Sequence, residues 1–364
     1  MPIEFAERLR RIPAYPVAAG YDLGHDVAML ASNESTFGPM PSVLEAATRV
    51  LGGANRYPDP SYWPLRRALA DRYGVPPERI ALGNGSCDIL LAAGEALLEP
   101  DSELVYAWPS FSVYPHLAAT SGARAIAVPL DAEERHDLEA MAREINVATR
   151  LVLICNPNNP TSTAIDLEDI VAFLKRVPRH VAVILDEAYV EFSLLVGDTY
   201  ASVDLLKRFP NLVLLRTFSK VYGLAGLRVG YALCGTQDFR IAVEQVRQPF
   251  YLNVAAHAAA AEAIKHQDEV ERRVTATIAD RLALERGLRR LGLWVAESDA
   301  NFLWLRLPEA EEPAAAEADV VAGLRERGVL VRAGTALGRE GALRITVGTS
   351  AENDKLLSAL GALL

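Results

Sequence analysis

The stretch that decides the fold is Arg150–Thr163, with the sequence RLVLICNPNNPTST. Its first half, LVLIC, is continuously apolar, which is typical of a strand buried on both faces of a parallel sheet. Its second half is a polar loop rich in Asn and Pro, which is typical of a connection leaving the end of a strand. The same change from an apolar run to polar residues recurs where VAVIL is followed by Asp186 and where LVLL leads toward Lys220.

Short apolar runs alternate with helical patterns from about Val27 to Gly235. The expected strands are Ile80–Gly83, Glu103–Ala107, Arg150–Cys155, Val181–Asp186, Leu212–Thr217 and Arg228–Cys234. Expected helices between them include Ser61–Tyr73 and Ile165–Arg176. This alternation predicts an α/β fold with a mostly parallel, doubly wound sheet.

The pattern changes after about Phe250, where one or two long helices are followed by three short strands and two helices. The expected strands are Phe302–Leu307, Val329–Arg332 and Leu343–Val347, and the helices are Ala315–Arg327 and Glu352–Leu363. We therefore expect a large domain over residues 36–260. Residues 1–35 and 261–364 would form an N-terminal arm and a smaller α+β domain.

Composition excludes several classes of protein. The chain has 364 residues and a net charge of −10, and it contains no basic run of the kind that binds nucleic acid. No apolar run approaches the roughly 18 residues that span a bilayer, and the first residues lack the apolar core of a signal peptide. The three cysteines form no CxxC pair, so neither a disulfide framework nor a metal site is expected. These features predict a cytoplasmic protein that binds neither nucleic acid nor membrane.

One lysine stands apart from the other four. Lys220 follows the apolar strand LVLLRT and has Gly-rich surroundings without acidic neighbours, whereas the other lysines lie in polar helical segments. A lysine in an apolar pocket has a lowered pKa, and its neutral amine can form a Schiff base. Taken alone, Lys220 is better explained as a strand-end side chain in water.

Three further loops end at the same predicted sheet edge as Lys220. They are the loop carrying Asn159, the strand end at Asp186 and the GNGS turn at 83–86. Ligands bind at the carboxyl edge of open α/β sheets, and a Gly-Ser turn that opens a helix suits a phosphate. Arg228 follows nearby and could bind the same phosphate. Each residue alone has an ordinary structural explanation. Together they suit pyridoxal phosphate, which needs a lysine, an anion site and a carboxylate at its ring nitrogen.

At these motifs the sequence resembles the histidinol-phosphate aminotransferase family, which belongs to the class I/II, fold-type I pyridoxal-phosphate aminotransferases. The resemblance covers nearly the whole chain. The motifs that carry it are ASNESTFGP (31–39), RYPD (56–59), GNGS (83–86), NPNNPT (156–161), DEAY (186–189), FSK (218–220), LAGLR (224–228), ANF (300–302) and LRITVG (343–348).

The resemblance implies a role for each site residue. Lys220 would bind the cofactor aldehyde and move the proton, Asp186 would pair with the ring nitrogen, and Tyr189 and Asn159 would contact the ring oxygen. Ser219, Arg228 and the backbone amides of Ser86 and Cys87 would hold the phosphate, and Phe111 would stack on the ring. Tyr57 would reach the cofactor of a partner subunit, which implies a homodimer. Arg344, Arg332, Asn33 and Tyr15 would bind or cover the substrate.

The sequence departs from the family pattern on the substrate side. Ser162 stands where NPTG has glycine, Cys87 precedes Asp88 where Asp-Glu is common, and Phe111 replaces a frequent tyrosine. These departures resemble the aromatic amino-acid branch of the family. The expected reaction exchanges an amino group with glutamate and 2-oxoglutarate, the donor being histidinol phosphate or, as the alternative, phenylalanine. A related amino-acid-phosphate decarboxylase and a non-enzymatic binding scaffold rank lower, because no motif favours the first and the cofactor residues argue against the second.

Overall fold

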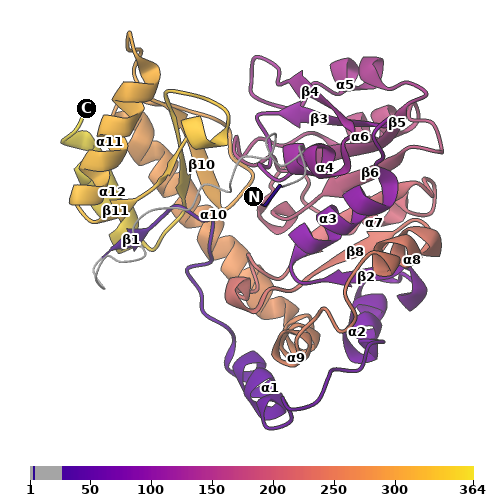
Figure 1. Cartoon of the computed structure of the whole chain (residues 1–364). Helices are drawn as coiled ribbons and strands as arrows, with labels where there is room; N and C mark the ends of the chain where they lie inside the picture. The colour runs from indigo at the N-terminus through magenta and orange to yellow at the C-terminus, as the bar shows by residue number, and fades with distance from the viewer. Residues whose placement is uncertain (1–2, 5–26) are drawn as a thin grey trace.

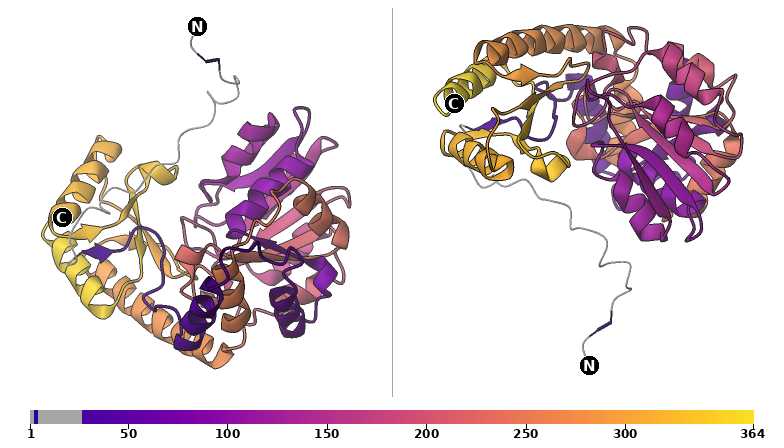
Figure 2. Two further views of the ribbon diagram at one scale, coloured as in Figure 1. Left: turned by 60° about the horizontal axis from the view of Figure 1, so that its bottom comes forward. Right: turned by 90° about the horizontal axis from the view of Figure 1, so that it is seen from above.

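The computed structural model describes residues 3–4 and 27–364. Its seven-stranded and four-stranded sheets lie in separate lobes, and the long helix α10 (Gln267–Arg290) leads from the large lobe to the small one (Figure 1). In the left view of Figure 2, the two lobes are inclined to each other and form a V. Tyr15, which the sequence assigns to the substrate side, lies outside the described residues.

The large lobe is built on a seven-stranded sheet of order β2-β8-β7-β6-β5-β3-β4. Its strands are β2 (Ile80–Gly83), β3 (Glu103–Trp108), β4 (Arg124–Pro129), β5 (Thr149–Cys155), β6 (Ala182–Asp186), β7 (Leu212–Thr217) and β8 (Gly230–Cys234). Only β8 runs against its neighbours, pairing antiparallel with both β2 and β7. The segment that enters β8 therefore lies at the edge where β2, β5, β6 and β7 end. This reversal brings Arg228 to the carboxyl ends of the parallel strands.

Helices cover both faces of this sheet, which explains its continuously apolar strands. Side chains that alternate along β5 enter two separate cores, Leu151 and Leu153 on one face and Val152 and Ile154 on the other. The first face packs against α3 (Ser86–Leu97), α4 (Tyr114–Ser121) and α8 (Gln237–Gln245). The second packs against α2 (Trp63–Tyr73), α5 (Leu138–Glu144), α6 (Leu167–Leu174), α7 (Ala201–Leu205) and α9 (Val254–Ala263), with α1 (Pro41–Leu51) against α9. The doubly wound α/β architecture predicted from the sequence is confirmed.

The small lobe contains a four-stranded antiparallel sheet of order β12-β13-β10-β9. Its strands are β9 (Trp294–Val295), β10 (Phe302–Arg306), β12 (Arg332–Ala333) and β13 (Ala342–Thr346). A further two-stranded sheet joins β1 (Ala28–Met29) in parallel to β11 (Val329–Leu330). The helices of this lobe are α11 (Pro313–Glu326), α12 (Ser350–Gly361), the C-terminal half of α10 and the short 3-10 helix η5 (Thr335–Leu337). The large lobe has the 3-10 helices η2 (Pro77–Arg79), η3 (Val190–Phe192) and η4 (Ala225–Leu227).

A buried carboxylate joins the two lobes. Glu134, in the loop between β4 and α5, accepts hydrogen bonds from the Trp304 indole nitrogen and from Arg306, both on β10. Arg339 approaches the same carboxylate at 3.4 Å. The Glu134 backbone has a left-handed φ of 61°, and its carbonyl accepts a bond of 2.7 Å from Thr163 Oγ1. We call this group of five residues the Glu134 clasp.

Candidate functional site

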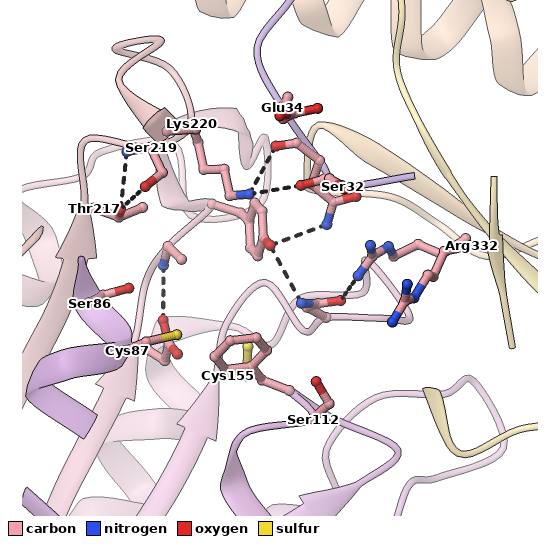
Figure 3. Close-up of a pocket in the computed structure, with 18 of the residues that line it drawn as sticks. Ser32, Glu34, Ser86, Cys87, Ser112, Cys155, Thr217, Ser219, Lys220 and Arg332 are labelled. Carbon is pink, nitrogen blue, oxygen red and sulfur yellow. Dashed lines mark hydrogen bonds between the residues drawn. The ribbon is translucent and has the colours of Figure 1, made fainter. Parts of the chain in front are cut away.

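A cavity of about 460 Å³ lies where the carboxyl edge of the large sheet faces the small lobe. Its lining includes twelve of the residues singled out from the sequence, namely Asn33, Ser86, Cys87, Phe111, Asn159, Asp186, Tyr189, Ser219, Lys220, Arg228, Arg332 and Arg344. Figure 3 shows Ser86, Cys87, Ser219 and Lys220 on one side of this space and Arg332 on the other. The structure therefore brings together in one site residues that lie up to 311 positions apart in the sequence (344 − 33).

Lys220 follows β7 and projects its amine into the middle of the cavity (Figure 3). Its Nζ donates to two backbone carbonyls, that of Asn33 at 2.9 Å and that of Ser32 at 3.3 Å. Burial, followed by the nearby positive charge of Arg344, lowers the pKa of Lys220 to about 7. A lysine with that pKa is partly neutral at physiological pH, so its amine can act as a nucleophile and as a base.

Asp186 ends β6 and lies at the floor of the same cavity. Burial raises the pKa of its carboxyl to about 6, although hydrogen bonds from the Tyr114 hydroxyl at 3.0 Å and the Ala188 amide at 3.3 Å act in the opposite direction. A buried carboxylate with neutral donors has a strong electrostatic preference for a cation beside it. It therefore suits a protonated ring nitrogen.

A cradle for an anion opens between α3 and the turn before β8. Helix α3 begins at Ser86 without a side-chain cap, so its first amides point toward the cavity edge without helical partners. The Arg228 guanidinium packs over Gly85, where a Cβ would lie only 2.5 Å from Nη2. Arg228 also contacts Ser219 Oγ at 3.5 Å. Burial raises the pKa of the Cys87 thiol to about 11, so the thiol remains protonated and adds no negative charge to the cradle.

The small lobe supplies the opposite wall. Arg344 on β13 donates to Asn159 Oδ1 at 2.7 Å and to the Ala31 carbonyl at 2.6 Å. Asn159 Nδ2 in turn reaches the Tyr189 hydroxyl at 3.5 Å, which also accepts a 3.2 Å bond from Asn33 Nδ2. These contacts link the substrate-side guanidinium to the two residues assigned to the cofactor ring oxygen.

Two residues that the sequence connected with this site are not seen in it. Tyr57 is 81% exposed on the surface of the chain, where it stacks on Phe250 with ring centroids 4.5 Å apart. Tyr15 is not among the described residues. Neither position tests the role that the resemblance implies for it.

The glycine conformation that the sequence left in doubt is present at Ser162. Its φ is 61°, a left-handed value that costs a residue with a Cβ about 1–2 kcal/mol. Two hydrogen bonds hold it there, from its amide to the Asn158 carbonyl at 2.8 Å and from its hydroxyl to the Thr161 carbonyl at 2.6 Å. The serine therefore keeps the shape of the loop that carries Asn159.

Sequence reasoning missed three residues that shape this site. Tyr114 bonds Asp186 from α4, Ser112 lines the cavity beside Phe111, and Leu337 lines it from η5. Ser112 and Tyr114 lie beside Phe111 in the stretch WPSFSVY (108–114), where the resemblance assigns a role only to the aromatic ring of Phe111. Leu337 carries no motif, and its place depends on how the small lobe folds.

No group of three or more His, Cys, Asp or Glu side chains within residues 3–4 and 27–364 is arranged to hold a metal ion. Across the same residues, no helix has the length and apolar character required to cross a membrane.

The residues present fit pyridoxal phosphate. The cradle of Ser86, Ser219 and Arg228 matches its phosphate, Asp186 its ring nitrogen and Lys220 its aldehyde. When bound, the cofactor supplies an electron-withdrawing ring that stabilises negative charge on the substrate Cα. The fold and this site together define the class of fold-type I enzymes that depend on pyridoxal phosphate.

Comparison with known proteins places the chain within that class. The family model for aminotransferase class I and II matches residues 25–360, which is most of the chain. The chain therefore belongs to the class I and II aminotransferases, and it is a transaminase that uses pyridoxal phosphate.

Named relatives and solved structures agree with the family. An aromatic amino acid aminotransferase of Thermobifida fusca is 44% identical over 91% of this chain and 89% of its own length. One of Cutibacterium acnes is 39% identical over 97% and 96%. The histidinol-phosphate aminotransferase of Sinorhizobium meliloti, solved with pyridoxal 5'-phosphate, superimposes with a TM-score of 0.87 at 29% identity, covering 99% and 97%. An aspartate aminotransferase of Thermus thermophilus with maleate gives 0.86 at 25% identity, covering all of both chains.

Proposed function

We propose that this aminotransferase transfers the amino group of an aromatic amino acid such as phenylalanine to 2-oxoglutarate. The observation that carries the proposal is the pairing of Arg344 with Asn159 at 2.7 Å, on the wall facing Lys220. A guanidinium so placed suits a substrate carboxylate, which every amino-acid donor and 2-oxo acid carries. Two curated relatives, at 39% and 44% identity, are named aromatic amino acid aminotransferases. These names favour phenylalanine, the alternative donor in the sequence analysis, over histidinol phosphate.

The residues divide the work of such a reaction. Arg344 holds the carboxylate and so orients the bond from Cα to hydrogen. Lys220 Nζ would take the proton from the substrate Cα, and the ammonium so formed would later give a proton back, because a pKa of about 7 suits both directions. Asp186 keeps the ring nitrogen protonated, and Tyr189 donates to the ring oxygen.

A second candidate substrate, histidinol phosphate, has one observation in its favour. Arg332 is the cross-strand partner of Arg344 in the β12–β13 pair, so two guanidinium groups lie at the same end of the cavity. Such a pair suits a phosphate. The structural likeness to the Sinorhizobium meliloti enzyme adds to this candidate. No observation favours the decarboxylase.

We also propose that two copies of the chain form a dimer that covers the face carrying Tyr57. Tyr57 stacks on Phe250 there, and both rings are exposed. Leu44 and Leu51 on α1 and Trp63 on α2 are further large apolar side chains that are exposed on the large lobe. A dimer that covered these side chains would remove their apolar surface from water. A cytoplasmic location remains the expectation from the sequence.

The deciding experiment is a half-reaction. The protein loaded with pyridoxal phosphate is mixed separately with L-phenylalanine and L-histidinol phosphate, and the absorbance change of the bound cofactor is followed by stopped flow. We expect kcat/KM for phenylalanine to exceed that for histidinol phosphate. The reverse order would overturn the aromatic assignment, and Lys220→Ala, which lacks the base, sets the background rate.

A further inference from the structure

We infer that Leu337 is a specificity-determining residue that contacts the side chain of the amino donor and favours a flat apolar ring. This inference rests on the proposed function and names the residue that would read the substrate's side chain.

The large lobe's part of the wall carries the polar residues that we assign to the cofactor. The cradle at Ser86 and Arg228, the carboxylate of Asp186 and the amine of Lys220 match the parts of the cofactor. Among the described residues, the small-lobe sheet and η5 contribute only Arg332, Leu337 and Arg344 to the lining. With the two arginines suited to anionic groups, Leu337 is the one apolar side chain on this wall, and it is 5% exposed.

The loop that carries Leu337 is held firmly in place. The Thr335 amide donates to the buried Glu317 carboxylate at 3.0 Å, and the Leu337 amide donates to the Gly334 carbonyl at 2.7 Å. Gly334 itself has no room for a Cβ, which would lie 2.4 Å from the Arg339 carbonyl. A wall residue on so constrained a loop discriminates better than one on a mobile loop, because it cannot retreat from a poor fit.

A second contact fixes η5 against the large lobe. Gly338 has a φ of +96°, and a Cβ there would lie 2.7 Å from the Trp108 ring. Trp108 ends β3, three residues before Phe111, and both Phe111 and Leu337 line the cavity. Behind Leu337 lies a small apolar cluster with Trp304, Ala296 and Ala342. An aromatic side chain would thus meet an apolar, supported surface.

The chemistry of that surface decides between donors. A phenyl ring placed against Leu337 loses no hydrogen bond and buries apolar area, whereas a charged side chain would lose water there without gaining a partner from it. Differences of this size in an apolar pocket change kcat/KM by about 10- to 200-fold. Glutamate, the other amino donor, has no ring, so a substitution of Leu337 removes no such contact from it.

The test compares Leu337→Asn with Leu337→Met. Asparagine keeps a similar shape but is polar, whereas methionine keeps the apolar contact at similar volume. We expect Leu337→Asn to lower the phenylalanine-to-glutamate ratio of half-reaction kcat/KM by about tenfold or more. Leu337→Met should hold that ratio within about threefold of the wild type, a difference well below the range for a lost contact.

A binding measurement provides a readout without turnover. Calorimetry on the loaded protein would compare 3-phenylpropionate, which has the ring and carboxylate but no amine, with glutarate. Selective weakening of 3-phenylpropionate by Leu337→Asn supports the assignment, and equal weakening of both acids, with normal thermal stability, overturns it. The wild-type preference between phenylalanine and histidinol phosphate tests the proposed function separately, because it does not involve the variants.

Discussion

The Glu134 clasp should stabilise the joined lobes by a measurable amount. Trp304 is fully buried, so removing Glu134 leaves its indole N–H without a partner, which costs about 1–3 kcal/mol. Arg306 and Arg339 are 38% and 42% exposed, so each ion pair adds under about 1 kcal/mol. We expect Glu134→Ala to lower the free energy of unfolding by about 1–5 kcal/mol, the sum of these terms.

A double-mutant cycle isolates the indole bond. Trp304→Phe removes the N–H, so Glu134→Ala should cost about 1–2 kcal/mol less in that background. The unfolding free energies of all four proteins would be measured in urea by circular dichroism. Trp63→Phe, at a tryptophan on α2, serves as the control and should be additive with Glu134→Ala. Additivity with Trp304→Phe as well would refute the bond's contribution.

Three further predictions concern titrating groups. Because the Lys220 pKa is about 7, capture of pyridoxal phosphate by the apo-protein should accelerate up to about pH 7 and level off above it, as followed by absorbance. Arg344→Gln should move that midpoint upward, and a wild-type midpoint near the ordinary value of about 10.4 would contradict the reasoning. Tyr114→Phe removes a hydrogen bond that lowers the pKa of Asp186, so that pKa should rise above about 6. The carboxyl would then be more protonated at pH 6.5 than at pH 8.5, and the affinity for pyridoxal phosphate, measured by fluorescence titration, should fall more at pH 6.5. An equal loss of affinity at both pH values would argue against this role of Tyr114. Burial lowers the pKa of His136 from 6.5 to about 4. The unfolded state therefore binds about one proton more than the folded state between these pH values, so stability should fall as pH decreases from 6.5 to 4. In His136→Asn the fall should be less steep, because this proton is no longer taken up on unfolding. Identical slopes of unfolding free energy against pH in urea titrations would disprove this.

The strands at the centre of the large sheet could be predicted because they are buried on both faces. LVLIC and VAVIL have no polar position to obscure the pattern, and β7 matches its predicted bounds of Leu212–Thr217. The edge strand β4 was not predicted, since RAIAVP is mostly exposed and lacks a continuous apolar run. The expected strand Val329–Arg332 is divided in the structure between β11 and β12, which belong to different sheets.

The site residues at the strand ends could be predicted because chain topology alone sends those ends to one edge. Lys220 and Asp186 each follow a recognisable apolar run. Tyr114, Glu134 and Leu337 could not be found in this way. Tyr114 and Glu134 act through contacts with residues 72 and 170 positions away, and Leu337 is placed by the packing of the small lobe. Such contacts depend on tertiary packing, which single-sequence periodicity does not describe.

The register of β12, β13 and β10 has a consequence for how this enzyme could change its substrates. Arg332 and Trp304 both oppose Arg344 across neighbouring strands, and Leu337 packs on Trp304. The groups that we propose to select the substrate thus lie on or beside the small sheet, while Lys220, Asp186 and Arg228, which we propose to hold the cofactor, lie at the edge of the large one. Substitutions in the small sheet can therefore alter which amino acid is accepted without displacing the groups that handle the cofactor. Related enzymes can in this way keep one chemical step while they accept different amino acids.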